Sequence, residues 1–496
     1  MITVRMSLGL ALLGTACGPV VSSSGTDAEG SSGTGGSDSS TSLGVPDPAT
    51  TTSSTTATDP STTAAGTTGG SADDTAETDT PTTGCLTDNC MLDVIVVVDN
   101  SSGMAGAQRA LALSMIQLDE QLRGLQADVQ VMFTTTDMDN QFCTPFQPEG
   151  YAPAMGSPVT TACTDRLQDF VGLGTDAPSE AEACTSVCPE PLAPDLDLFV
   201  AFNPDVHNLP QEGSVDLDGD GELETATAQA LACMAPMGVN GCGFESPLEA
   251  MLQTLNPEAT WNQGPRPFVR DGAALGVVLL SNEVDCSIRT PAMMNNADLY
   301  EVSPNTGTPM LSSAVCWNAA ADCVDQGGGV YDCQPSASDN LQPIDRYSSF
   351  LDYLSQDQGK PVFMLGLLGV PTVTAHNPDP PFQPIEGGRD SLVIRDWTED
   401  DVLPEDAAAG VTAADLQFNY GIGPGCSRPE STGVAQATPP LRTLDLCSHL
   451  DGQVGEDGEH LVKCCVESIC DDEYESGMTC LANMLVDPVM GLPPKG

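Results

Sequence analysis

A run of apolar residues that ends at an acid limits the possible folds of this chain more than any other feature. Within the stretch Leu92–Asp99, the unbroken apolar run is Val94–Val98, whose residues are all β-branched, and it ends at Asp99. This composition is typical of a parallel strand that is buried on both faces. Ser101 follows Asp99 in a short turn before a helical pattern. Because open α/β sheets bind ligands at the carboxyl ends of their strands, we expect Asp99 and Ser101 to contribute to a metal site there.

Hydrophobic periodicity next to this strand predicts a βαβ unit. Leu111, Met115 and Leu118 recur at helical spacing within 104–122, and 127–136 has the composition of a second strand. A βαβ unit has a right-handed crossover and parallel strands, so the pattern predicts an α/β fold. Further helices are expected over 247–255, 343–354 and 471–485, and further strands over 274–281 and 361–368.

The α/β pattern is interrupted by two segments that we expect to be long insertions, about 138–240 and 287–342. The first opens with a stretch rich in Pro, Gly and Asp that carries several cysteines, so disulfides are expected to hold it in place. The whole folded part is expected to cover 85–496 and to include a cysteine-rich C-terminal part.

The first 17 residues have the organisation of an export signal. Arg5 precedes an apolar segment, Met6–Leu13, which is too short to span a bilayer. The small residues before Cys17 resemble the lipobox of bacterial lipoproteins, which implies cleavage at Cys17 and attachment of a lipid to it. Gly18 follows in place of Asp, which within that class points to the outer membrane or the cell surface. The alternative is an ordinary secretory signal with a chance cysteine.

Residues 18–84 are expected to form a disordered tether. They are almost entirely Ser, Thr, Gly, Ala, Asp and Pro, and they contain no aromatic residue and no hydrophobic periodicity. A flexible chain of this length has an r.m.s. reach on the order of 45 Å. Such a tether would hold the folded part away from a membrane.

Cysteine number agrees with export. The chain has 19 cysteines, and an even number remains for pairing when Cys17 is set aside for lipid. Complete pairing is expected in an oxidising compartment, although the connectivity cannot be deduced from sequence. Cys464 and Cys465 are adjacent, so we expect them to bond to different partners.

The charge balance excludes one class of partner. Asp and Glu number 70 against 15 Lys and Arg, which gives a formal net charge of −55. Such a chain repels nucleic acid and anionic lipid headgroups and attracts divalent cations. The alternative interpretation is that the acidic surface only keeps an exported protein soluble.

Asp99 and Ser101 resemble the first motif of von Willebrand factor type A domains, D-x-S-x-S, with Gly103 in place of the second serine. Four further pieces are similar to a group of large, cysteine-rich bacterial lipoproteins that carry a modified type A domain, and the similarity extends over about 91–486. The resemblance implies a Rossmann-like, doubly wound and mostly parallel sheet with helices on both faces. It also implies a divalent cation at the end of the sheet that binds protein ligands. The four pieces are 241–250, 278–287, 343–347 and 468–474.

In such domains a metal-ion-dependent adhesion site leaves the ion incompletely coordinated, so that a carboxylate of a partner completes its shell. The resemblance places Glu245 at the usual Thr position and Asn282 where an Asp is usual, beside Asp99 and Ser101. Asp99 and Glu245 then supply two negative charges to a Mg²⁺ or Ca²⁺ ion, and Asp285 is a further candidate. The alternative is a decayed site whose residues cap helices and turns.

A second acidic motif lies between Asp216 and Glu224. Its acids at positions 1, 3, 5 and 9 and its Gly at position 6 match the start of an EF-hand-like calcium loop. Thr227 stands at position 12, where a bidentate Glu is needed, so a distant acid or water would have to complete the shell. The alternative is a solvated acidic turn. The candidate ligands are Asp216, Asp218, Asp220, Glu222 and Glu224.

The sequence offers little support for an enzyme. It contains four His in no metal-protease arrangement, and its cysteines are better explained as disulfides than as nucleophiles. We expect a lipid-anchored envelope protein that binds an unknown protein ligand through an acidic side chain of that ligand and contacts the membrane only through its N-terminal lipid. The alternative is a structural envelope lipoprotein that no longer uses its metal site.

Overall fold

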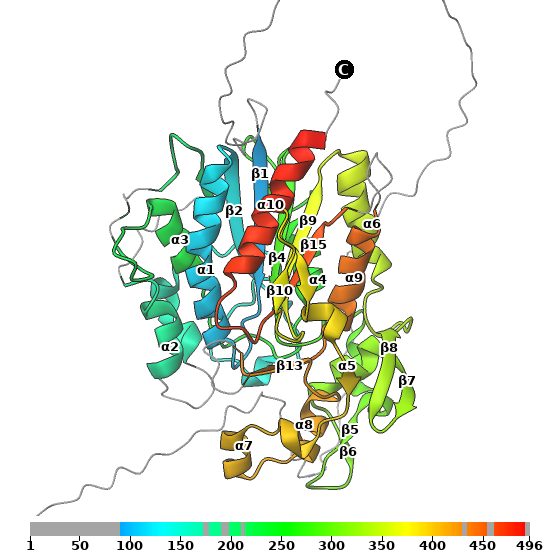
Figure 1. Cartoon of the computed structure of the whole chain (residues 1–496). Helices are drawn as coiled ribbons and strands as arrows, with labels where there is room; N and C mark the ends of the chain where they lie inside the picture. Colours follow the sequence, from blue (N-terminus) through cyan, green and yellow to red (C-terminus); the bar gives the residue numbers. More distant parts are fainter. Residues whose placement is uncertain are drawn as a thin grey trace, which may run out of the picture. The chain divides into compact units, whose positions relative to one another are not determined.

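The computed structural model describes residues 90–171, 178–189, 198–209, 213, 215–428, 434–453 and 461–491, and Figure 1 traces their path. The expected export signal with Cys17 and the expected tether lie outside the described residues.

Six strands form the central sheet, in the order β15-β9-β4-β1-β2-β3. β1, which contains the apolar run, lies between β4 and β2 and is parallel to both. β9 and β15 continue the parallel arrangement, and only β3 is antiparallel to its neighbour. The predicted α/β fold with a mostly parallel sheet is therefore confirmed. The strands are β1 (Met91–Val98), β2 (Asp128–Thr135), β3 (Val200–Phe202), β4 (Ala274–Leu280), β9 (Val362–Leu368) and β15 (Cys464–Ser468).

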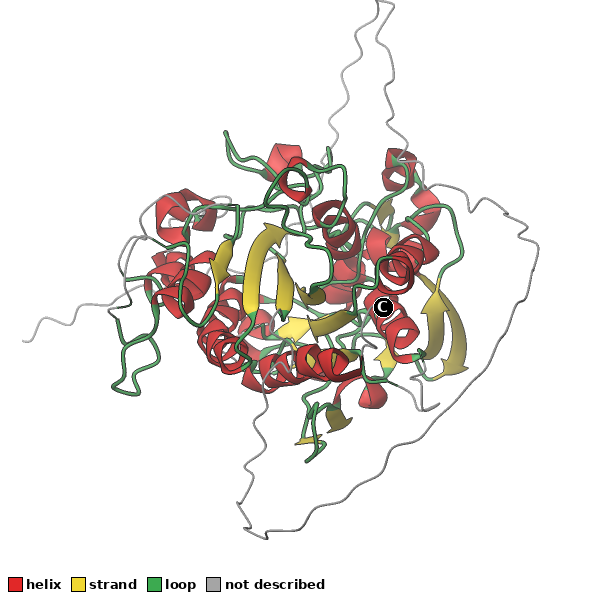
Figure 2. Ribbon diagram, turned by 90° about the horizontal axis from the view of Figure 1, so that it is seen from above, coloured by secondary structure: helices red, strands yellow, loops and turns green. Residues whose placement is uncertain are grey.

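Helices cover both faces of the sheet, as Figure 2 shows from above. Val94, Val96 and Val98 pack in one buried core with α1, α3 and α10, whereas Ile95 and Val97 pack in a second core with α4, α6 and α9. Because both faces are buried, β1 needs no polar alternation, which explains its continuous apolar run. The helices are α1 (Ala105–Gly124), α3 (Ala226–Met234), α4 (Pro247–Thr254), α6 (Asp345–Asp352), α9 (Leu441–Asp451) and α10 (Glu475–Gly491).

Four main elements were not predicted: α3, α9, β3 and β15. α3 is rich in alanine and every one of its side chains is buried, so it shows no polar stripe to reveal a helical period. β15 begins with two cysteines and contains a glutamate, and therefore lacks the apolar run of a buried strand. α3 and β3 also show that part of the expected insertion 138–240 belongs to the main layers.

Shorter elements fill the segments between the main ones, and α5, α7, α8 and the β5–β6 hairpin lie below the sheet in Figure 1. The shorter elements include helices and small two- or three-stranded sheets. They are α2 (Pro178–Thr185), α5 (Ala314–Ala320), α7 (Pro404–Ala409), α8 (Ala413–Tyr420), β5 (Glu301–Val302) with β6 (Pro309–Met310), β8 (Val330–Pro335) between β7 (Ala321–Gly327) and β12 (Ile394–Arg395), β10 (Ala375–His376) with β11 (Pro384–Glu386), and β13 (Cys426–Ser427) with β14 (Gln436–Ala437).

Disulfides hold the loops between these elements, and every cysteine within the described residues, Cys90 included, is bonded. Cys464 pairs with Cys447 and Cys465 pairs with Cys480, which confirms that the adjacent cysteines have different partners. The other pairs are Cys143–Cys242, Cys163–Cys184, Cys188–Cys233, Cys286–Cys316, Cys323–Cys333 and Cys426–Cys470.

Among the helices described, none is both long and apolar enough to cross a lipid bilayer.

Candidate metal centre

The predicted metal ligands come from three loops that meet at the carboxyl end of the sheet. Asp99 and Ser101 follow β1, Asn282 follows β4, and Glu245 lies just before α4. The backbone N–H of Asp99 donates to the carbonyl of Leu280 at 2.9 Å, so the ends of the adjacent strands β1 and β4 stay in register. The parallel topology thus brings together acids that are far apart in sequence.

Asp99 is fully buried, and its carboxylate is hydrogen-bonded on both oxygens. The backbone N–H of Ser101 donates to Oδ1 at 2.9 Å, and the Ser281 hydroxyl donates to Oδ2 at 2.9 Å. Burial raises the pKa of Asp99, and these hydrogen bonds lower it in part. The arrangement fixes the orientation of this side chain.

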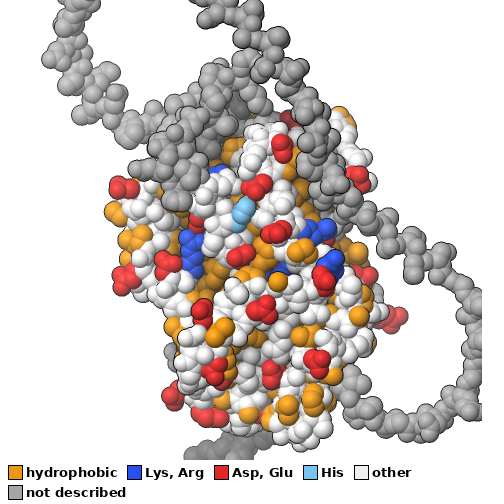
Figure 3. All heavy atoms as spheres, turned by 90° about the vertical axis from the view of Figure 1, so that its right-hand side faces the viewer, with side chains coloured by type: hydrophobic (Ala, Val, Ile, Leu, Met, Phe, Trp, Pro, Cys, Tyr) orange, Lys and Arg blue, Asp and Glu red, His pale blue; other side chains and the backbone are white. Residues whose placement is uncertain are grey.

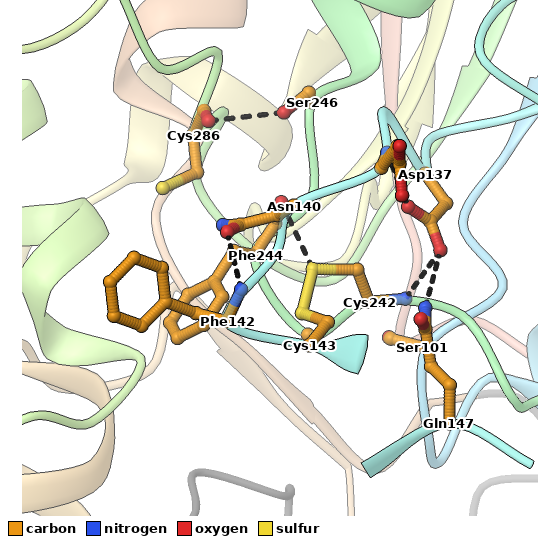
Figure 4. The surroundings of a disulfide bond; sticks show 12 residues. Ser101, Asp137, Asn140, Phe142, Cys143, Gln147, Cys242, Phe244, Ser246 and Cys286 are labelled. Atoms are coloured by element: carbon orange, nitrogen blue, oxygen red, sulfur yellow. Dashed lines mark hydrogen bonds between the residues drawn. A yellow bond between two sulfur atoms is a disulfide. The ribbon is translucent and has the colours of Figure 1, made fainter. Parts of the chain in front are cut away.

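Glu245 is held rigidly by its backbone. Its carbonyl accepts from the N–H of Cys286 at 2.7 Å, and the next residue, Ser246, donates its N–H to the carbonyl of Thr136 at 3.1 Å. The Ser246 hydroxyl also donates to the carbonyl of Cys286 at 3.0 Å (Figure 4). The Glu245 loop is therefore hydrogen-bonded to the segments that follow β2 and β4.

A disulfide and a buried acid brace the same loop. Cys242 bonds to Cys143, and the N–H of Cys242 donates to Asp137 Oδ2 at 3.0 Å (Figure 4). The side chains of Gln147 and Tyr151 donate to the same oxygen, at 2.8 and 3.0 Å. Asp137 lies two residues after the end of β2, and its hydrogen bonds show that it supports the loop.

The side chain of Glu245 differs from these supporting groups because no described group neutralises it. It is 1% exposed, and neither of its carboxylate oxygens has a hydrogen-bond partner within the described structure. Burial raises its pKa well above the ordinary value, and repulsion from Asp99 and Glu283 raises it further. Ser101 lies near enough to lower this pKa in part, yet the Ser101 hydroxyl is itself without a partner of normal geometry.

Glu283 is a third buried acid at this end of the sheet, and the sequence reasoning missed it. It is 8% exposed, and burial, followed by repulsion from Asp99, raises its pKa to about 8, while Glu245 acts in the opposite direction. No Lys or Arg of the described residues is among the groups that shift the pKa of these three acids. A signal was available, since Glu283 comes within three residues of a buried strand end.

Several other oxygens in these loops are buried without a partner. They include Ser101 Oγ and Asn282 Oδ1, two of the predicted ligands. Most buried polar groups in proteins are hydrogen-bonded, and each unsatisfied one costs about 1–3 kcal/mol. Mg²⁺ and Ca²⁺ take carboxylate, hydroxyl and amide oxygens as ligands. The oxygens present therefore fit a divalent cation.

The spacing of the acids limits how such an ion would be held. Among the described residues, the one group of three acidic side chains with ligand oxygens all within 4.8 Å of one another is Asp216, Asp218 and Glu224. Asp99, Glu245 and Glu283 are thus more widely spaced, and an ion at the end of the sheet would need hydroxyl and amide oxygens as well as carboxylates.

Two details depart from the expectations. Asp285, a further candidate ligand, instead accepts from Arg442 Nε at 2.9 Å and from the N–H of Leu248 at 3.1 Å, so it caps α4 within a buried ion pair. Asp285, named only as a further candidate, is therefore left out of the proposed ligand set. Gly103 has φ +91°, a backbone conformation that residues with a side chain rarely adopt, which explains why glycine stands at the position of the motif's second serine.

The acidic loop 216–224 does not belong to this centre. It precedes α3, and it borders a groove formed with α1 and the start of α10. Thr227 lies within α3, where its hydroxyl is bonded to Asp119 of α1. The position that lacks the expected Glu is thus part of a helix and not of the loop.

No family model, curated protein or solved structure matches this chain.

Proposed function

We propose that this chain is a lipid-anchored binding protein of the cell envelope with a domain like the type A domain of von Willebrand factor. In this proposal, Asp99, Ser101, Glu245 and Asn282 hold Mg²⁺ or Ca²⁺ at the carboxyl end of the sheet. An acidic side chain of a protein ligand is the expected partner of that ion. The mostly parallel sheet and the origin of the ligands in three separate loops support the proposal.

The buried carboxyl of Glu245, which has no hydrogen-bond or ion-pair partner among the described residues, is the observation that carries the proposal. In a decayed site, the former ligands would act as caps or enter ion pairs, as Asp285 does with Arg442 in the neighbouring loop. Glu245 is equally buried and has neither kind of partner among the described residues. A bound cation compensates its charge and the nearby charge of Asp99, because two carboxylates neutralise one divalent ion.

Export and anchoring rest on separate support. The eight disulfides within the described residues favour an oxidising compartment. Figure 3 shows acidic side chains scattered over the face drawn there, with fewer basic ones, which suits an exported and strongly acidic protein. The lipid at Cys17 remains a proposal from the sequence.

A second function, a structural envelope lipoprotein, is favoured by how deeply the centre is buried. Asp99 is 0% exposed and Glu245 is 1% exposed. The N–H of Thr438 donates to the carbonyl of Asn282 at 2.9 Å, and Tyr420 at the end of α8 has a pKa raised by burial and by Glu283. Segments from the C-terminal half therefore cover the centre. In this second function the ion would stabilise the domain without touching a partner.

Thermal unfolding with Mg²⁺ alone tests the metal centre. A ligand that binds only the folded state raises the Tm by mass action. We expect Mg²⁺ to raise the Tm of the wild type and of Glu258→Gln, a control at an exposed acid, but not of Glu245→Gln. Equal shifts in all three proteins would refute the assignment of Glu245.

Capture of proteins from an envelope extract separates the two functions. If the ion contacts the partner, a chelator abolishes capture at a temperature where the domain stays folded, and Glu245→Gln captures nothing in Mg²⁺. Capture that persists in chelator would assign the ion to structure alone.

A further inference from the structure

The loop from Asp216 to Glu224 is folded tightly around its first acid. The N–H groups of Gly219 and Gly221 donate to the two carboxylate oxygens of Asp216, at 2.7 and 3.1 Å. Both glycines have positive φ, +84° and +93°, which L-residues with side chains rarely adopt. The chain therefore curls back on itself before α3.

This fold brings three carboxylates to one point. Asp216, Asp218 and Glu224 each place an oxygen within 4.8 Å of the other two. Oxygens bound to a single Ca²⁺ at 2.3–2.6 Å lie at most about 5 Å apart. The spacing therefore suits one calcium ion.

Glu224 provides an independent reason to expect an ion. It is only 9% exposed, and its Oε1 accepts from the N–H of Leu217 at 2.8 Å. Its Oε2 is buried and has no partner among the described groups. A buried carboxylate oxygen without a donor is unfavourable, and a cation between the three acids would satisfy it.

The structure also shows why position 12, occupied by Thr227, supplies no ligand to the loop. Thr227 donates its hydroxyl to Asp119 and accepts from Arg123 Nη2 at 2.6 Å, so it faces α1. Thr225 caps α3 by accepting from the N–H of Ala228 at 3.0 Å, and it also donates to Asp119 at 2.7 Å. Because α3 begins at Ala226 with Thr225 as its N-cap, Glu224 is the last acid before the helix that can direct its side chain towards the loop.

We propose that this loop binds Ca²⁺ through Asp216, Asp218 and Glu224, and that the ion fastens the loop to the α1–α3 helix pair. Three carboxylates in an irregular loop suit Ca²⁺ better than Mg²⁺, which demands near-octahedral geometry. The loop borders a groove of about 540 Å³, which gives water access to the remaining coordination positions. We expect a Kd on the order of 10⁻⁴ to 10⁻³ M, the range of extracellular calcium modules.

This site is separate from the metal centre at the end of the sheet. α1 begins beside that centre at Ala105, and Asp119 is ~21 Å further along the helix at 1.5 Å per residue. A measurement that resolves individual segments of the chain can therefore report on the loop separately from the metal centre.

Hydrogen exchange read by mass spectrometry on the full chain measures calcium binding locally. In the wild type, Ca²⁺ should slow exchange in peptides that cover 216–228, with a midpoint that reports the Kd. Glu224→Gln should weaken this midpoint about tenfold or more, since it replaces a ligand by a neutral side chain of the same shape. Glu222→Gln is the matched control, because its exposed side chain is outside the group of three acids. It should shift the midpoint less than about threefold.

Three outcomes would overturn the proposal: no slowing by Ca²⁺ in the wild type, the same slowing in Glu224→Gln, or equal weakening by both substitutions. The last would indicate only a general attraction of Ca²⁺ to acidic residues. Asp99→Asn, at the metal centre, should leave the midpoint in 216–228 unchanged. Exchange in chelator should be the same for wild type and Glu224→Gln, which excludes misfolding as the cause.

Discussion

The carboxyl of Glu283 links the stability of the metal-free protein to pH. Burial and the nearby Asp99 raise its pKa from an ordinary value of 4.5 to about 8. In the unfolded chain the same group ionises near its ordinary value. Between these two pH values the folded state therefore binds more protons than the unfolded state, and the free energy of unfolding falls as the pH rises.

The size of the effect follows from the two pKa values. Ionisation of the unfolded chain is nearly complete at neutral pH, whereas the folded carboxyl is still mostly protonated. Between about pH 5 and pH 7 this difference should remove about 2–3 kcal/mol from the free energy of unfolding. Glu283 is only 8% exposed, so solvent should screen this effect little.

Urea unfolding in chelator and without reductant measures the prediction. Repulsion within a chain of net charge −55 also lowers stability as the pH rises, so the informative quantity is a difference between variants. Relative to wild type, Glu283→Gln should gain about 2–3 kcal/mol more at pH 7 than at pH 5. Glu258→Gln, at an exposed acid, should show no such change with pH.

The same experiment can also contradict the raised pKa of Glu283. If the difference between wild type and Glu283→Gln is equal at the two pH values, Glu283 is not a buried acid with a raised pKa. Saturating Mg²⁺ should reduce the difference at pH 7, because a nearby cation lowers the pKa of Glu283 in the folded state towards its value in the unfolded chain.

Further predictions address the other parts of the chain. Glu245→Thr should weaken Mg²⁺ binding in calorimetry by removing a charge, and adding Asn282→Asp should restore it; no change in either variant would contradict the ligand assignment. Arg442→Met should lower the free energy of unfolding in urea by about 3–5 kcal/mol, because it leaves Asp285 buried without its cation. Cys17→Ser should release the protein from membranes and remove the mass of the acyl chains; a wild-type protein without lipid would contradict this. Alkylation of the denatured, unreduced protein should label fewer than two thiols, and more would contradict the pairing argument.

The central part of the fold could be predicted because short stretches of sequence determine its strand and its helix. Val94–Val98 is continuous and β-branched, so both its strand structure and its burial follow from sequence. The helix after Asp99 shows a clear apolar stripe, and it is present as α1. α3 and β15 have no comparable local signal, since they are held by their neighbours in the sheet layers and by disulfides. Such elements depend on tertiary contacts that a sequence pattern does not show.

Prediction of the candidate site was limited in a different way. Asp99 follows its strand directly, so its position at the end of the sheet was predictable. Glu283 and Asp285 both follow β4, and sequence alone gave no reason to treat them differently. Sequence distance also hid the partner of Asp285, since Arg442 lies 157 residues further along the chain.

Arg442 explains why two buried acids near the same end of the sheet, Asp285 and Glu245, have different surroundings. At Asp285 the guanidinium neutralises a buried charge and leaves an ordinary helix cap. Glu245 is equally buried, but no cation from the described chain reaches it, and Asp99 and Glu283 add further negative charge nearby. The fold thus supplies an arginine to one of these acids, whereas no Lys or Arg of the described residues is among the groups that shift the pKa of the others. The proposed metal centre is therefore supported more by this missing counter-charge than by the number of acids.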